Sequence, residues 1–241
     1  AQSHVKVSFE MPEYTADTDA FGTLKLLEAI RSNNLQSIAR FYQASTSELY
    51  GKVQEVPQRE VTPFYPRSPY GCSKLFAHWI TTNYRESYGI FGCNGLLFNH
   101  ESPRRGSNFV TNKVVKTAVQ IYRGVTDKLE LGNLDSYRDW GHSKDYVKAM
   151  HKIVNHETPD DFVVSTGETH SVREMVEYVF RRLDMNYQDY VVQNPAFMRP
   201  EELKYLKGDS TKARTVLGWK PEYTFETLLD EMIEHWKEKI R

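Results

Sequence analysis

The chain has 241 residues, of which 39% are hydrophobic, and this length can bury a substantial core as one large domain or two small ones. Its formal net charge of −1 at pH 7 argues against a general nucleic-acid binder or a membrane-surface protein, because no one-sided basic excess is present. The two cysteines, Cys72 and Cys93, give neither zinc-ligand spacing nor a disulfide framework. No apolar run approaches the length of a membrane span, and the N-terminus has no signal-peptide pattern. We therefore expect a cytoplasmic protein.

In the first part of the chain, hydrophobic periodicity predicts helices and strands in alternation. The predicted elements are a helix at 16–32, a strand at 38–42, a helix that begins near residue 69 and a strand at 96–98. The second helix is expected to bury the apolar stripe Leu75, Phe76, Trp79 and Ile80. Such alternation is typical of a parallel sheet with crossover helices, in which ligands bind beyond the carboxyl ends of the strands. We therefore expect residues 45–48 and 99–101 to line one crevice.

The second part of the chain is less regular. The same periodicity predicts helices at 107–123, 143–155, 171–183, near 209–217 and at 225–240, and strands at 129–131 and 162–164. Gly218 and Pro221 supply a stop after the helix near 209–217. We see no internal repeat or low-complexity linker, and we expect the two halves to interleave in space.

Tyr70 and Lys74 form the most informative pair of polar residues. Ser68 can cap a helix and Pro69 suits its first turn, so a helix that begins here places Tyr70 and Lys74 on one face. A general base works best with a pKa near the operating pH, whereas a free tyrosine has a pKa of about 10. A cation within roughly 4–6 Å lowers such a pKa by about 1–3 units, and an oxidised nicotinamide would act in the same direction. The pair therefore indicates redox chemistry, although Tyr-x-x-x-Lys also occurs by chance in many helices.

A glycine-containing run and three histidines could suggest a phosphate-binding turn and a metal site, but their sequence context supports neither. Dinucleotide-binding sheets usually open with a glycine-rich turn between the first strand and the first helix, and this chain has no such turn. The glycines in the run 89–95 have a similar spacing. They follow a helix and enter a strand, however, which is the reverse of the required context. His4, His100 and His142 lack helical spacing and no cysteine accompanies them, so we expect no metal site.

Four segments together are specific enough to indicate a family: Ser45–Gly51, Ser68–Lys74, Phe98–Gly106 and Arg138–His142. They resemble the GDP-mannose 4,6-dehydratase family of the extended short-chain dehydrogenase/reductase superfamily, and the similarity runs from the first residue to the closing helices. By this comparison the chain lacks roughly the first hundred residues, including the glycine-rich turn. Residues 1–3 would be the tail of a cofactor-lining strand.

The resemblance implies an α/β fold with a Rossmann-like doubly wound parallel sheet, N-terminally truncated and interleaved with a smaller α/β substrate-binding domain. Residues 1–106 and 143–166 would belong to the NADP-binding domain, and residues 107–142 and 167–241 mainly to the sugar-nucleotide domain. The complete enzyme would be a homo-oligomer, either a dimer or a tetramer.

The resemblance also implies roles for individual residues, with NADP as the cofactor and GDP-mannose as the substrate. Tyr70 would take the proton of the mannose 4-hydroxyl, Lys74 would lower the phenol pKa, Thr46 would bind the 4-oxygen, and Glu48 would remove the C5 proton and help expel the 6-hydroxyl as water. Cofactor contacts would come from Ala1, Gln2, Ser3, Tyr14, Lys74, His100 and Arg105. Substrate contacts would come from Asn99, Asn108, Lys113, Arg138, Arg199 and Glu202.

Three functional classes remain open at this level. The first is an active dehydratase. The second is a truncated module that keeps the catalytic face but binds NADP weakly or not at all by itself, because the glycine turn that receives the pyrophosphate is absent. The third is a related sugar-nucleotide epimerase or reductase, which Glu48 and the run 99–106 disfavour, because such enzymes need no base at C5.

Overall fold

The centre of the molecule is a three-stranded parallel sheet. The structure, a computed structural model, describes residues 1–198, 203 and 205–240. The strands lie in the order β1 (Arg40–Thr46), β2 (Phe91–Leu97) and β7 (Asp161–Val164), and both neighbouring pairs are parallel. The predicted α/β class with a parallel sheet is therefore confirmed.

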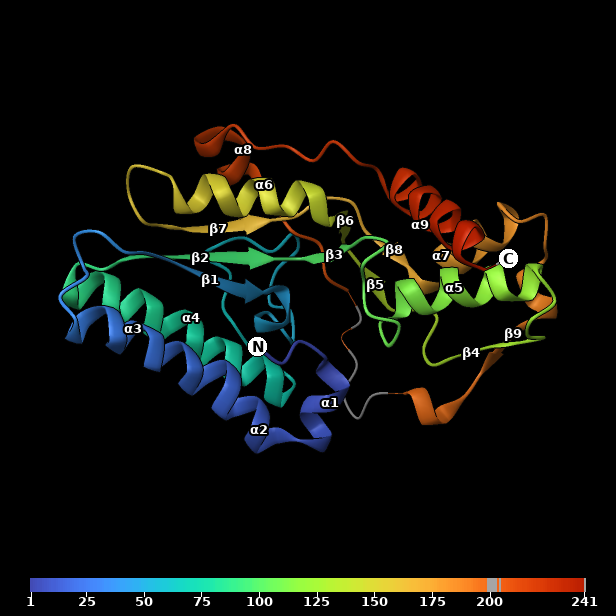
Figure 1. The fold of residues 1–241 in the computed structure, drawn as a ribbon, viewed down its shortest axis with the longest axis horizontal. Coiled ribbons are helices and arrows are strands. Elements are labelled where there is room, and N and C mark those ends of the chain that lie inside the picture. Colours follow the sequence, from blue (N-terminus) through green and yellow to red (C-terminus); the bar gives the residue numbers. More distant parts are fainter. Residues whose placement is uncertain (199–202, 204, 241) are drawn as a thin grey trace.

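Helices cover both faces of this sheet (Figure 1). On one face lie α3 (Gly22–Ser32) and α4 (Pro69–Tyr88), and on the other lie α6 (Ser143–Val154) and α8 (Thr211–Leu217). The chain thus returns to the sheet through α6, β7 and α8 after leaving it. This arrangement agrees with the expected interleaving of the halves, whereas the domain boundaries stay a prediction.

The N-terminal region differs from the prediction in two ways. The expected helix at 16–32 is preceded by α1 (Val5–Glu10) and α2 (Pro12–Ala16), and a π-helical turn, η1 (Asp17–Phe21), joins α2 to α3. The expected strand tail at residues 1–3 is wrong, since the structure has no strand there. The backbone N–H of Gln2 donates to the Asp19 carboxylate at 2.8 Å instead of to a neighbouring strand.

The predicted apolar stripe of α4 is confirmed in part: Leu75 and Ile80 are partly buried and pack against the core, whereas the prediction is wrong for Phe76 and Trp79. Phe76 and Trp79 are 39% and 55% exposed, while the buried face of the helix includes Tyr70, Lys74 and His78. Periodicity counts apolar side chains, but this helix turns polar side chains toward the sheet. The two catalytic candidates on α4 therefore lie on its buried face.

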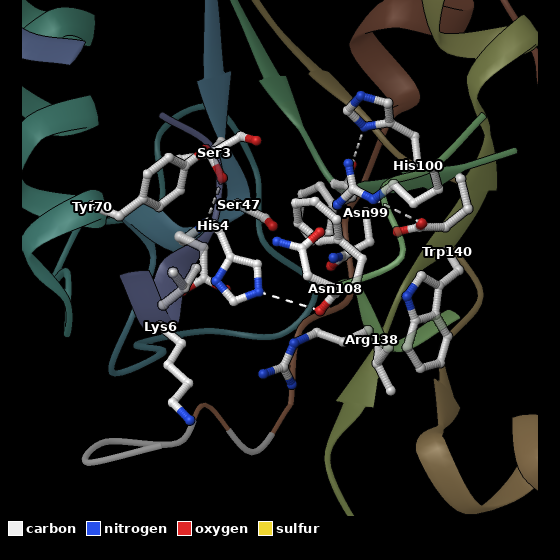
Figure 2. Close-up of a pocket in the computed structure, with 18 of the residues that line it drawn as sticks. Ser3, His4, Lys6, Ser47, Tyr70, Asn99, His100, Asn108, Arg138 and Trp140 are labelled. Carbon is white, nitrogen blue, oxygen red and sulfur yellow. Dashed lines mark hydrogen bonds and ion pairs between the residues drawn. The ribbon is translucent and has the colours of Figure 1, made fainter. Parts of the chain in front are cut away.

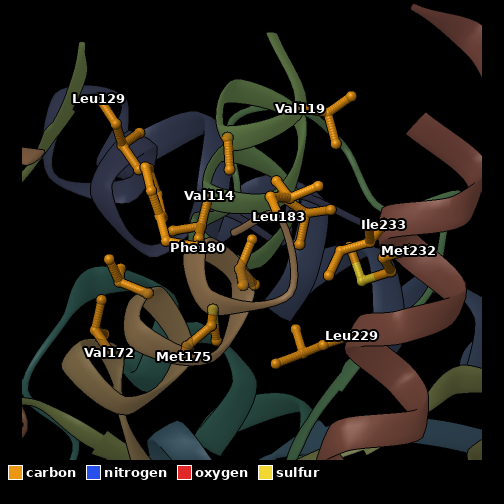
Figure 3. Close-up of a cluster of buried hydrophobic side chains, with 14 of the residues drawn as sticks. Val114, Val119, Leu129, Val172, Met175, Phe180, Leu183, Leu229, Met232 and Ile233 are labelled. Carbon is orange, nitrogen blue, oxygen red and sulfur yellow. The ribbon is translucent and has the colours of Figure 1, made fainter. Parts of the chain in front are cut away.

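The second half has its own apolar core, built from three helices and two short strands. The helices α5 (Val110–Tyr122), α7 (Val172–Arg181) and α9 (Phe225–Lys239) pack together, as Figure 3 shows for side chains such as Val114, Met175 and Leu229. The strand β4 (Leu129–Leu131) pairs in parallel with β9 (Val191–Gln193). The predicted helices of this half are present to within a few residues, and Gly218, at φ 58°, ends α8 as expected.

Short strands that the periodicity does not predict connect this core to the sheet. The strand β3 (Asn99–Glu101) pairs in parallel with β6 (Trp140–His142), and β5 (Tyr137–Arg138) pairs antiparallel with β8 (His170–Ser171). The remaining short elements are η2 (Ser47–Leu49), η3 (Tyr187–Asp189) and η4 (Pro195–Phe197). Across the described ranges, no helix combines the length and the apolar character needed to cross a membrane.

Candidate active site

A cavity of about 720 Å³ lies beyond the carboxyl ends of β1 and β2. The crevice expected between residues 45–48 and 99–101 is confirmed, because both segments line this cavity. Most of the predicted site residues lie on its wall: Ala1, Ser3, Thr46, Glu48, Tyr70, Lys74, Asn99, His100, Arg105, Asn108, Lys113 and Arg138. Figure 2 shows several of them converging from both halves of the chain.

The start of α4 places Tyr70 and Lys74. The Ser68 hydroxyl accepts from the Gly71 N–H at 2.9 Å and Pro69 occupies the first turn, as the sequence predicts. Tyr70 and Lys74 are only 8% and 6% exposed. The Lys74 Nζ lies 5.9 Å from the centre of the Tyr70 ring and donates to the Ala44 carbonyl at 3.3 Å.

The expected lowering of the Tyr70 pKa by Lys74 is wrong for this structure. Burial raises the pKa of the phenol; a hydrogen bond with Thr46 and the charge of Arg105 oppose the rise, while the charge of Glu48 adds to it. The pKa of Lys74 is itself lowered by burial, an effect that the charge of Asp19 opposes. Desolvation therefore outweighs the hydrogen bond and the charge that oppose it, and the phenol is protonated near pH 7.

Thr46 and Glu48 reach the same wall from the end of β1. The Thr46 hydroxyl accepts from the Glu48 N–H at 3.2 Å, which starts the short turn η2, and it also hydrogen-bonds with the Tyr70 phenol. Glu48 is partly exposed and lines the cavity. A hydroxyl, a phenol and a carboxylate thus face one space, which suits successive proton transfers to and from one small molecule.

His100 lies on the cavity wall, and one of its ring nitrogens is a fixed hydrogen-bond acceptor. Its Nδ1–H donates to the Phe98 carbonyl at 2.9 Å, and its ring stacks on Tyr146 at 4.7 Å between centroids. Burial lowers the pKa of His100 to about 4, so the ring is neutral near pH 7. Because a carbonyl can only accept, the proton is on Nδ1 and Nε2 is left as an acceptor.

A second carboxylate on the wall, Glu101, is buried, and no individual role was predicted for it. It is 2% exposed, lies 2.9 Å from the Arg105 Nε and accepts from the Thr111 hydroxyl at 2.6 Å. Burial raises the pKa of Glu101, and Arg105 and Thr111 oppose that rise. Arg105 also lies flat against Phe109, with its Cζ 3.4 Å from the ring centre, so two contacts hold its guanidinium at the cavity.

The far end of the cavity is cationic. Arg138 is buried and donates to the Leu203 carbonyl at 2.7 Å, and Lys113 lies over the Phe197 ring. The Asn108 carbonyl is 3.3 Å from the Nε2 of His4, which joins the loop before α5 to the N-terminal segment. Guanidinium and ammonium groups on a cavity wall suit an anionic ligand such as a phosphate.

Two predicted residues that the structure describes, Gln2 and Tyr14, are not among those that form the wall. The Gln2 side chain donates to the Thr15 hydroxyl at 3.1 Å, and Tyr14 is 53% exposed on α2. Arg199 and Glu202 lie outside the described residues.

Several wall residues were missed by the sequence reasoning. They include Lys6, Asn133, Ser136 and Phe197. Lys6 was missed because α1 was not predicted. Ser45, Ser47 and Glu101 belong to the segments expected to line the crevice, but no individual role was predicted for them. Within the described part of the chain, no group of three or more histidine, cysteine or acidic side chains could hold a metal ion.

A doubly wound parallel sheet, with a buried tyrosine and lysine at its carboxyl edge, defines a Rossmann-type protein of the extended short-chain dehydrogenase/reductase class. The sequence pattern of one family, described as GDP-mannose 4,6 dehydratase, matches residues 1–232, and the chain belongs to that family.

Individual relatives agree with this assignment. The chain is 52% identical to a GDP-mannose 4,6 dehydratase of Drosophila melanogaster, over 97% of this chain and 64% of that protein. It is 50% identical to the human GDP-mannose 4,6 dehydratase, over 100% of this chain and 69% of that protein. The chain therefore spans about two thirds of the length of these relatives.

Solved structures have the same fold. The structure of RMD from Pseudomonas aeruginosa complexed with NADPH gives a TM-score of 0.88 at 25% identity, over 99% of this chain and 79% of that one. A UDP-glucose 4-epimerase from Thermotoga maritima, with UDP-glucose, also gives 0.88 at 24% identity, over 100% and 76% of the two chains.

Proposed function

We propose that this chain carries the active site of a GDP-mannose 4,6-dehydratase, which converts GDP-mannose into GDP-4-keto-6-deoxymannose with NADP as its cofactor. The observation that carries the proposal is the convergence of Thr46, Glu48, Tyr70 and Lys74 on one cavity. Family membership and relatives named for this reaction support the choice of substrate. Homo-oligomeric assembly and a cytoplasmic location stay predictions.

The wall residues fit a dinucleotide. Lys74 donates to the Ala44 carbonyl, and its ammonium has further N–H groups for a ribose hydroxyl. His100 offers a neutral acceptor and Arg105 a guanidinium held by Glu101, while Ala1 and Ser3 add to the wall beside them. NADP held by these residues would supply the hydride acceptor for C4 of the sugar and, once reduced, the hydride donor for C6.

The chain's own residues handle the protons. Once the positive charge of the oxidised cofactor lies beside it and the phenol is ionised, Tyr70 would take the proton of the 4-hydroxyl, with Thr46 holding the oxygen, and a 4-keto sugar would result. The ketone acidifies the C5 proton, which Glu48 removes. Glu48 then gives that proton to the departing 6-hydroxyl, which leaves as water. After hydride returns to C6, C5 would take up one proton, which balances the proton that Tyr70 removed from the 4-hydroxyl and gives up again. The net change is the loss of one water with no net consumption of cofactor.

Substrate recognition is proposed for the other end of the cavity. Asn99, Asn108, Lys113 and Arg138 would contact the diphosphate, ribose or guanine, since ammonium and guanidinium groups form charge-assisted bonds with phosphate. Arg199 and Glu202 stay predictions of the same kind.

The product tests the proposal. Incubation of the protein with GDP-mannose and saturating NADP should give a nucleotide sugar lighter by one water, detected by mass spectrometry. A product of unchanged mass would instead indicate an epimerase, and unchanged GDP-mannose would indicate a binding module.

A further inference from the structure

Two lysines from opposite halves of the molecule meet at one aromatic ring on the cavity wall. Lys6 stands on α1 and Lys113 on α5, and their Nζ atoms lie 5.8 Å and 3.5 Å from the centre of the Phe197 ring. All three residues line the cavity. Lys6 also donates to the Ala196 carbonyl at 2.9 Å, so the same side chain holds the segment that carries the ring.

No carboxylate of the described residues pairs directly with either ammonium group, that of Lys6 or that of Lys113. Burial lowers the pKa of Lys113; the more distant Glu130 opposes this effect and the charge of Lys6 adds to it. Like charges held close together are stabilised when an anion binds between or beside them.

The position of Lys6 indicates which part of the ligand supplies the anion that the two lysines bind. Figure 2 shows Lys6 extending away from Tyr70, whose phenol marks the end of the cavity where the sugar reacts. The groups toward which it extends are those proposed for the diphosphate and nucleoside, including Lys113 and Arg138. Lys6 uses one of its three donors on Ala196, which leaves two for phosphate oxygens.

We infer that Lys6 is a further substrate-binding residue, which joins Lys113 in binding the diphosphate of the sugar nucleotide from the opposite wall. This inference rests on the proposed function. It makes α1, and not only the second half, part of the substrate site. Because Lys6 and Lys113 belong to different halves, a bound diphosphate links these halves across the cavity.

The test is calorimetric titration of the 241-residue chain with GDP and with guanosine, which lacks the diphosphate. Lys6→Met should weaken GDP binding about tenfold, as expected for a lost hydrogen bond to a charged group, and leave guanosine binding unchanged. Lys6→Arg should retain most of the affinity, because it keeps the charge. Lys116→Met is the matched control, since Lys116 lies on α5 over Trp236 and outside the cavity wall.

Four results would overturn the inference. The first is failure of the wild-type chain to bind GDP, and the second is binding of GDP by Lys6→Met as tightly as by wild type. Equal weakening of GDP and guanosine would mean that Lys6 only holds the Ala196 segment. Weakened NADPH binding with unchanged GDP binding would assign the ammonium to the cofactor's phosphates. The proposed reaction and this inference can fail separately. If the protein isomerises GDP-mannose and Lys6→Met selectively loses GDP affinity, the proposed reaction is wrong and the inference about Lys6 still holds.

Discussion

Burial and charge act against each other at Tyr70. The sequence predicts that Tyr70 and Lys74 share a helix face, and this is confirmed because the spacing of an α-helix fixes it. The direction of the phenol pKa was not predictable, because desolvation depends on what packs over the ring. In the structure burial dominates, and the phenol stays protonated until further positive charge is bound beside it.

Glu48 is assigned to the second chemical step, so its replacement should separate the two steps. In Glu48→Gln, oxidation at C4 should survive as a transient absorbance of the reduced nicotinamide, while loss of water falls by at least about a hundredfold. Tyr70→Phe should suppress the absorbance change itself. Stopped-flow absorbance and product analysis measure both variants.

Tyr65→Phe is the matched control for the tyrosine, because Tyr65 is 49% exposed and lies outside the wall. Normal turnover in Glu48→Gln would disprove the assignment of C5 deprotonation to this carboxylate.

His100 should make stability depend on pH. Its pKa falls from 6.5 to about 4 on folding, so below pH 6.5 the unfolded chain binds the proton more readily. The free energy of unfolding therefore includes the full contribution of the neutral His100 ring above pH 6.5. As pH falls from 6.5 toward about 4, this contribution is lost, and the free energy of unfolding decreases by at most about 3 kcal/mol. Urea denaturation should show a shallower pH dependence for His100→Gln over this window.

His151→Gln serves as the comparison, because His151 is exposed on α6. Equal slopes for wild type and His100→Gln would show that His100 does not titrate differently in the folded chain.

At the scale of elements, helices and strands with strong periodicity were predictable, and those shaped by tertiary contacts were not. The helices α5 to α9 follow their apolar positions closely. The three-residue strands β3 and β6 are too short for a periodic signal, yet their pairing places Asn99 and His100 at the cavity. The π-helical turn η1 interrupts the helical repeat of apolar residues, and α4 buries polar side chains. The periodicity of apolar residues therefore predicted neither feature.

The corrected orientation of α4 predicts the cost of two substitutions. Leu27, on the neighbouring helix α3, is fully buried, so Leu27→Ala should lower the free energy of unfolding by about 2–5 kcal/mol. Trp79→Ala, at a side chain 55% exposed, should cost no more than about 1 kcal/mol. Chemical denaturation measures both values. A larger loss for Trp79→Ala than for Leu27→Ala would mean that the exposed face of α4 is buried in solution.

At the scale of the whole molecule, the site exists only because the chain crosses between its halves. Thr46, Tyr70 and Lys74 come from the sheet and its helix, whereas Lys113 and Arg138 come from the second half. Alternating elements predicted the sheet and the crevice at its edge. The small strands and the N-terminal segment that close the cavity depend on contacts between distant residues, which one sequence does not disclose.

The central claim is that one cavity moves a hydride from C4 to C6 of the same sugar while Glu48 handles the C5 proton. The most direct measurement uses GDP-mannose deuterated at C4, with saturating NADP and product analysis by NMR. We expect a dehydrated product that carries the deuterium on its C6 methyl group. A label that stays on C4, or that is lost to water, would contradict it.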